Sequence, residues 1–144
     1  MTHPDITGKR LWQLQAEWRE RFLAGETFAV ERARVAPWVY LFHSPGAETN
    51  AKAAAFFEQS AWSERVYLWT DGWGETMGSQ KLKVAEILDI VISEGLDAVY
   101  LYDAINGWTF VVTHEDQQRY IFKADPFCDG LAKVGEAAAK KQPE

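Results

Sequence analysis

The clearest alternation of apolar and polar positions lies in the C-terminal half of the chain, where three segments have the composition of β-strands. Residues 98–102 are mostly β-branched or aromatic, as strands favour. Asn106 and Gly107 follow, and because both tolerate a positive φ they predict a hairpin turn. Residues 108–113 alternate between two faces, and residues 120–123 read as a third strand. We therefore predict a three-stranded antiparallel meander, about the minimum that is stable without help.

Two longer segments carry the three- and four-residue spacing of amphipathic helices. Residues 9–24 place leucine and aromatic side chains at this spacing, and Gly25 follows as a stop signal. A stronger pattern starts after Ser79, a potential cap, and ends at Gly95. Its apolar stripe consists of Val84, Ile87, Leu88, Val91 and Ile92. Because the stripe is rich in β-branched residues, we expect burial against the sheet to keep this segment helical.

The region between these two helices contains alternating strand and helix signals. An apolar run predicts a buried strand over residues 38–43. Ser44 as the cap and Pro45 as the first helical residue then open a helix, which an alanine-rich run carries to residue 59. Residues 65–69 are a further short strand candidate.

Three further segments have weaker signals. Residues 28–35 are assigned to a helix because apolar residues recur two turns apart. Residues 71–74 contain two glycines and predict a turn. Asp125 caps a last helix, whose apolar stripe over residues 127–138 is weakened by two glycines.

The order of elements predicts a fold of the α+β class. We expect a mixed or antiparallel sheet of about five strands, flanked by helices, with the meander at its C-terminal end. At 144 residues the chain has the length of one domain. We expect that domain to span residues 1–144, with residues 1–8 and 140–144 flexible.

Composition favours a protein partner over a nucleic acid. The net charge is −6 and the isoelectric point is about 5.1, whereas nucleic-acid recognition depends on basic patches. An acidic surface is suited to a basic protein partner. The seven tryptophans are many for this length. Most would supply core mass, and Trp73 and Trp108 are candidate anchors of a binding surface.

Cysteine usage and hydropathy indicate a cytoplasmic location. Cys128 is the one cysteine, so no intramolecular disulfide can form, as expected in a reducing compartment. We expect it to be a small buried apolar residue. No apolar run approaches the ~18 residues that span a bilayer, and the N-terminus lacks the apolar region of a signal peptide. No membrane association is predicted.

Candidate catalytic residues stand without a strong motif around them: there is no P-loop, GxGxxG, GxSxG, HExxH or CxxC. His114 and Glu115 lie where a predicted strand enters a loop, and His43 and Asp103 end two other predicted strands. If these four met in one cleft, they could act as a base and an orienting group or as metal ligands. The simpler expectation is that His114 bonds to loop backbone and that Glu115 accepts loop N–H groups or pairs with Arg119. No metal or cofactor is expected.

The run DAVYLYDAINGWTFVVTHE resembles a motif of an uncharacterised bacterial family, domain-of-unknown-function family 4275. The matching positions are Asp97, Tyr100, Asp103, Trp108, Thr109, Val111, Thr113, His114 and Glu115. A second similarity links VYLFHSP and AAAFFEQ with a strand and the helix after it in that family. The family has no established activity, so the resemblance bears on fold and bacterial origin and leaves function open.

Three functions remain open from the sequence. One is a protein-binding module comparable to an immunity or inhibitor protein, the second is a small enzyme using His114, Glu115, His43 and Asp103, and the third is an oligomerising domain. The acidic balance, the aromatic content and the lack of a catalytic motif favour the binding module over catalysis. A fold class by itself does not select among the three.

Overall fold

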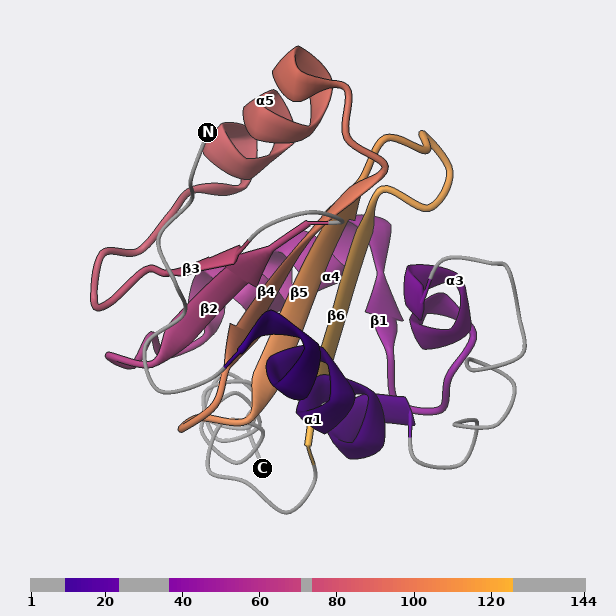
Figure 1. Ribbon diagram of the computed structural model, residues 1–144. Coiled ribbons are helices and arrows are strands. Elements are labelled where there is room, and N and C mark those ends of the chain that lie inside the picture. The colour runs from indigo at the N-terminus through magenta and orange to yellow at the C-terminus, as the bar shows by residue number, and fades with distance from the viewer. Residues whose placement is uncertain (1–9, 24–36, 71–73, 126–144) are drawn as a thin grey trace, which may run out of the picture.

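A six-stranded antiparallel sheet forms the centre of the computed structural model, which describes residues 10–23, 37–70 and 74–125 (Figure 1). The strands lie in the order β1-β6-β5-β4-β2-β3, and every neighbouring pair is antiparallel. Their bounds are β1 Glu48–Thr49, β2 Val66–Trp69, β3 Gly74–Thr76, β4 Ala98–Asp103, β5 Trp108–Thr113 and β6 Tyr120–Ala124. The predicted α+β class is confirmed, with six strands in place of about five.

The predicted antiparallel pairing of residues 98–102 with residues 108–113 is confirmed, across a loop that contains Asn106 and Gly107. Ala98 pairs with Thr113 at one end and Asp103 with Trp108 at the other, so residues 104–107 form the loop. Gly107 has a φ of 76°, and its N–H donates to the Asp103 carbonyl over 2.9 Å. Asn106 keeps a negative φ. Of the two turn residues that tolerate a positive φ, only Gly107 adopts one.

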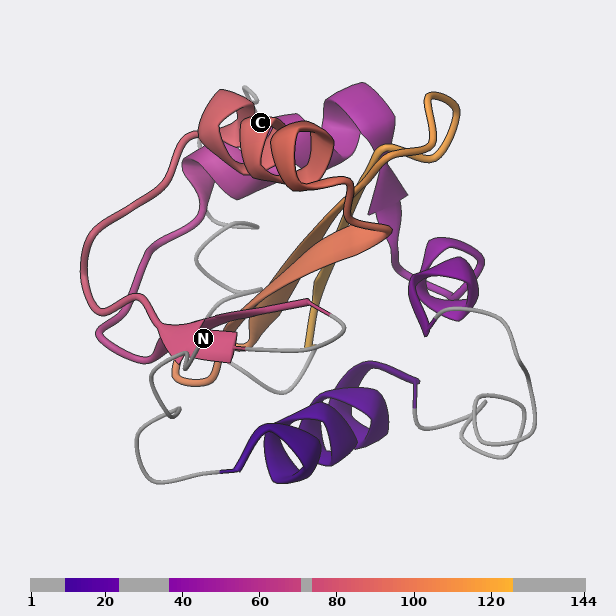
Figure 2. The ribbon, with the colours of Figure 1, turned by 45° about the horizontal axis from the view of Figure 1, so that its top comes forward.

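Helices cover both faces of this sheet (Figure 2). Helices α1 (Leu11–Leu23) and α3 (Pro37–Phe42) lie on one face, and α4 (Asn50–Gln59) and α5 (Val84–Glu94) lie on the other. All residues of β4 and β5 are therefore buried. The alternation read along residues 108–113 is confirmed, since successive side chains enter opposite cores.

The core under α1 is built from aromatic rings. Trp69 and Tyr100, paired across β2 and β4, stack with their ring centroids 5.5 Å apart and their planes 1° apart. Trp18 of α1 meets both rings edge-on, an arrangement that the ring quadrupoles favour. The stripe predicted for the first helix is confirmed, because Leu14, Trp18 and Phe22 are all buried.

The core under α4 and α5 combines aromatic stacking with aliphatic packing. Phe57 of α4 stacks on Phe110 of β5 at 4.1 Å between centroids. Ile87 and Val91 of α5 are buried in the same cluster. Ile92, the last member of the predicted stripe, is 61% exposed. At about 100° of rotation per residue it lies at the edge of the stripe, so the sheet does not cover it.

The strand predicted over residues 38–43 is wrong, because α3 occupies Pro37–Phe42. Pro37 is the first helical residue, a position that proline favours. Trp38 and Leu41, three residues apart, are buried together against the sheet. The Ser44 hydroxyl donates to the Leu41 carbonyl over 2.7 Å, so Ser44 closes this helix rather than opening the next one.

Two predicted helix starts are also wrong, although both helices exist. Helix α4 begins at Asn50 with Thr49 as its N-cap, not at Ser44-Pro45. Helix α5 begins at Val84, and the N–H of its N-cap Lys83 donates to the Glu86 side chain over 2.8 Å. Ser79 lies in the preceding turn. The bond between the Lys83 N–H and the Glu86 side chain caps the N-terminus of this helix. An acidic residue is favoured in the first turn, where the helix dipole is positive.

Strands β1 and β3 were not predicted. Each is only two or three residues long and pairs with a longer neighbour, β1 with β6 and β3 with β2. Such short segments lack a periodic signal, and long-range pairing alone makes them strands. The short edges also leave few backbone groups open to another sheet.

Several predictions fall outside the described residues: the helix over residues 28–35, most of the turn at 71–74, the last helix, Trp73, Cys128 and both ends. Within the described part, no helix is long and apolar enough to cross a membrane.

Two isoleucines of α5 provide a test of how the helix faces the sheet. We expect Ile87→Ala, which empties a fully buried site, to reduce the free energy of unfolding by about 2–5 kcal/mol. Ile92→Ala, at an exposed position on the same helix, should change it by less than about 0.5 kcal/mol. Urea unfolding of the two variants measures both values, and equal losses would contradict the arrangement.

Candidate functional site

The four polar residues singled out in the sequence do not meet in one cleft. His114 follows β5 at one end of the sheet, whereas Asp103 pairs with Trp108 at the opposite end of that strand. Six residue steps separate Trp108 from His114 along this extended segment, about 20 Å. His43 is exposed after α3, and its ring contacts Phe42. No group of three or more His, Cys, Asp or Glu within the described ranges could hold a metal ion.

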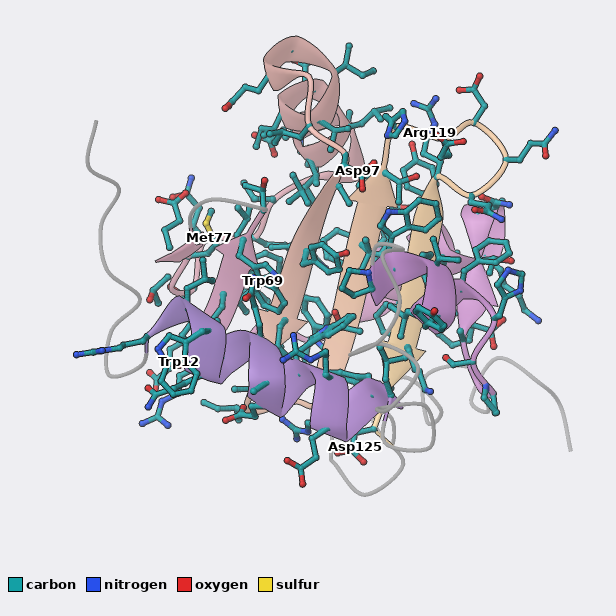
Figure 3. All side chains as sticks on the ribbon, turned by 45° about the vertical axis from the view of Figure 1, so that its right-hand side comes forward. Trp12, Trp69, Met77, Asp97, Arg119 and Asp125 are labelled. Carbon is teal, nitrogen blue, oxygen red and sulfur yellow. The ribbon has the colours of Figure 1, made fainter. Side chains whose placement is uncertain are left out.

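His114 is held between two carboxylate side chains. Its Nδ1 lies 3.1 Å from the Asp97 carbonyl oxygen and 3.4 Å from the Asp97 Oδ1. Its Nε2 lies 2.7 Å from the Glu115 Oε2. The Asp97 carboxylate also accepts a bond from the Trp38 indole over 3.3 Å. Figure 3 shows Asp97 near Arg119 and far from Asp125, which follows β6 at the other end of the sheet.

This geometry favours the charged imidazolium. The bond to the Asp97 carbonyl, with the charges of Glu115 and Asp97, raises the pKa of His114 above its ordinary value. Because both ring nitrogens face acceptors, neither presents a lone pair to a substrate, as a general base must. The expected bond from His114 to loop backbone is confirmed. Neither role expected of Glu115 is found among the described residues: its carboxylate pairs with His114, and Arg119 pairs with Asp116.

Asp103 organises the hairpin loop from a fully buried position. Its carboxylate accepts bonds from the backbone N–H groups of Ser63, Ile105 and Asn106 at 2.8–3.0 Å. The Ser63 hydroxyl and the Asn106 amide donate to it as well, at 2.6 and 3.0 Å. A carboxylate with five donors around it has no lone pair directed to a cleft, so Asp103 is a structural residue.

Trp108 is not a surface anchor, because its ring is fully buried. Its indole N–H donates to the Ala61 carbonyl over 2.7 Å, and Phe57 meets the ring edge-on. The other proposed anchor, Trp73, lies outside the described residues.

A shallow hollow adjoins His114 at the C-terminal end of α5. It has a volume of about 440 Å³ and is lined by Val91, Ile92, Gly95, Leu96, Asp97 and His114. Gly95, with a φ of 64°, ends the helix, and the Leu96 N–H turns back to the Val91 carbonyl over 3.0 Å. This Schellman arrangement places Leu96 against the last helical turn. The hollow is thus lined by both apolar and ionisable side chains.

Carboxylates are exposed along α5 and directly after it. Glu86, Asp89 and Glu94 are exposed along α5, and Asp97 follows. No lysine or arginine occurs between Val84 and Asp97. We refer to Ile92, Glu94, Leu96, Asp97, His114 and Glu115 together as the α5 face.

A second polar cluster, which the sequence did not reveal, joins α1 to the Asp103 end of the sheet. The buried Tyr102 hydroxyl donates to the Glu17 carboxylate and accepts from Arg21, both at 2.6 Å. Arg21 also donates to the Asp125 carboxylate over 2.8 Å. Burial and the bond to Glu17 raise the pKa of the Tyr102 phenol far above its ordinary value. These groups satisfy one another, so the cluster is a structural tie.

Comparison with known proteins gives no relative: no family model matches the chain, and no match was found among the curated proteins or the solved structures. The function must therefore be argued from the geometry of the described residues.

The ion cluster at His114 predicts a defined pH dependence of stability. The folded-state pKa of His114 is raised, so its stabilisation is complete below the unfolded value of about 6.5 and is lost as the pH rises through the folded pKa. We expect the difference in Tm between wild type and His114→Gln to be largest at the acidic end and to shrink with rising pH. Thermal melts of both proteins at a series of pH values measure this difference in Tm.

His43→Gln is the matched control, since it removes the other described histidine from an exposed site. Its Tm difference should not follow the same pH profile. A His114→Gln difference that stays constant or grows with pH would contradict the ion cluster.

Replacement of Asp103 tests the hairpin loop. Asp103→Asn substitutes an amide donor for an acceptor oxygen in front of buried N–H groups. We expect the free energy of unfolding to fall by about 1–3 kcal/mol, measured by urea unfolding. Asp89→Asn, the same change at an exposed position, should cost less than about 0.5 kcal/mol.

Proposed function

We propose that the protein is a protein-binding module and that its α5 face docks a basic segment of a partner that carries one large apolar side chain. The observation that carries the proposal is Ile92, an exposed isoleucine that lines a hollow together with Leu96 and Asp97. Immunity and inhibitor proteins act by this kind of docking without chemistry of their own. A cytoplasmic location and membership of the bacterial family that the sequence resembles are part of the same proposal.

The apolar part of the face supports an anchored contact. Ile92 is 61% exposed, and Val91 and Leu96 line the hollow next to it. Interfaces gain most of their affinity from a few anchors that enter such pockets, and surrounding polar contacts exclude water. A large apolar side chain of a partner would cover Ile92 and occupy part of the hollow.

The charge of the face supports a basic partner. Asp97 lines the hollow, Glu115 pairs with the lining residue His114, and Glu86, Asp89 and Glu94 are exposed along α5. Charges of opposite sign at the rim steer association and select the partner. A lysine or arginine on each side of the apolar anchor would match this surface.

The alternatives receive less support from the same residues. Catalysis by His114, Glu115, His43 and Asp103 would need a shared cleft, and these side chains lie apart, with His114 engaged at both nitrogens. Self-association through the α5 face would bring like charges together, because a two-fold dimer apposes the same patch. Strands β1 and β3 are too short to favour edge-to-edge pairing.

Selection from a displayed random-peptide library on the immobilised protein tests the proposal. We expect the selected peptides to carry a net positive charge and one large apolar residue, and to bind less tightly as salt concentration rises. Ile92→Asp should weaken their binding about tenfold or more, as loss of a central anchor does. Fluorescence anisotropy of the labelled peptides gives the Kd.

Ile105→Asp is the matched control, because Ile105 is also an exposed isoleucine, 47% accessible, and lies in the β4–β5 loop at the opposite end of the hairpin. It should leave the Kd unchanged. Peptides without basic residues, or equal losses in the two variants, would overturn the proposal.

A further inference from the structure

His114 is the residue of the α5 face whose charge changes near neutral pH. Its ring lines the hollow, as Asp97 does, and its side chain is 50% exposed. The other ionisable members of the α5 face, Glu94, Asp97 and Glu115, are all carboxylic acids. A protonated His114 is therefore a positive charge inside a surface that otherwise attracts cations.

The imidazole lies between the two carboxylates that a cation from another molecule would meet here. Its Nδ1 is 3.4 Å from Asp97 Oδ1, and its Nε2 is 2.7 Å from Glu115 Oε2. An imidazolium donates from both nitrogens and engages both acids, whereas a neutral ring has a single N–H. The Asp97 carboxylate is also held by the uncharged Trp38 indole of α3 over 3.3 Å. This bond does not depend on the charge of His114, so the acid stays in place for another cation.

Within the described part of the chain, three charged side chains act on the ring: Asp97, Glu115 and Arg119. The two acids favour the imidazolium and the guanidinium opposes it. Arg119 lies at the same end of the sheet as Asp97 (Figure 3) and pairs with Asp116. The part of α5 that lines the hollow is apolar. The bond to the Asp97 carbonyl, together with the two acids, leaves the pKa of His114 above its ordinary value.

We propose that His114 regulates docking on the α5 face by competing, when it is protonated, with a lysine or arginine of the partner for the carboxylates of Asp97 and Glu115. This inference rests on the proposed docking function and adds its regulation. Binding of the partner releases the proton of His114 to the solvent, and a basic segment binds more tightly as the pH rises through the pKa of His114. The two effects are linked and equal in size.

Measurements of the Kd from about pH 6 to pH 9, around the range in which histidine titrates, test the proposal. The probe is a peptide from the display selection, synthesised with blocked termini and without histidine, so that it does not titrate itself. We expect the Kd of wild type to fall about two- to fivefold with rising pH, the range that one exposed ion pair accounts for. The Kd of His114→Gln should stay near the value that wild type reaches at high pH.

Two further variants separate charge from other effects of substitution. His114→Arg keeps a positive charge at every pH, so it should bind the peptide as weakly as protonated wild type does across the whole range. His43→Gln is the matched control, because it removes a histidine from an exposed site outside the α5 face. It should retain the pH profile of wild type.

NMR titration of the His114 ring signals in wild type gives a readout that needs no variant and holds even if substitution destabilises the chain. Saturation with the peptide should lower the pKa of His114, because the bound cation disfavours the imidazolium. An unchanged pKa, or a pH profile of the Kd that wild type and His114→Gln share, would overturn this inference and leave docking through Ile92 intact. Peptide binding that does not depend on Ile92 would overturn both proposals.

Discussion

Burial of β4 and β5 on both faces is the constraint on which the rest of the structure depends. Every residue of these two strands is buried, so neither face of the hairpin can remain against water. Helices α1 and α3 cover one side and α4 and α5 the other. Antiparallel sheets commonly expose one face, and here aromatic side chains on both faces require a layer above and below. The covering helices are short, and their packing against the rings, more than their own propensity, stabilises them.

Polar groups inside this sandwich are fully committed to structure. Thr109 accepts the Trp18 indole bond and donates to the Leu101 carbonyl over 2.6 Å, and Asp103 collects the donors of its loop. A buried polar group without a hydrogen-bond partner would cost free energy. The hydrogen bonds that avoid this cost occupy the lone pairs and donors that a catalytic group would have to offer to a substrate. The residues proposed to meet another molecule lie at the margin of the sheet, on the α5 face.

Local patterns predicted a large share of the fold. The hairpin, the strand Val66–Trp69 and the helices α1, α4 and α5 follow from periodicity, β-branched content and glycine stops, all of which act over a few residues. Where a local signal was ambiguous, it was decided by distant contacts. Residues 38–43 have the composition of a strand, yet the buried pair Trp38 and Leu41 packs as a helix on the sheet. The helix starts at Asn50 and Val84 differ from the predicted ones because Ser44 closes α3 and Lys83 with Glu86 opens α5.

Pattern and composition predicted the α+β class, the antiparallel β4–β5 hairpin, most of the buried positions of the helices and the acidic character of the molecule. Only the tertiary structure decided strand order, the pairing of β1 and β3, the exposure of Ile92 and the separation of His114 from Asp103. It also brought Asp97 beside His114. The physical reason is range: propensity and periodicity act between near neighbours in the chain, whereas a site is made by residues that burial and strand pairing bring together from distant segments.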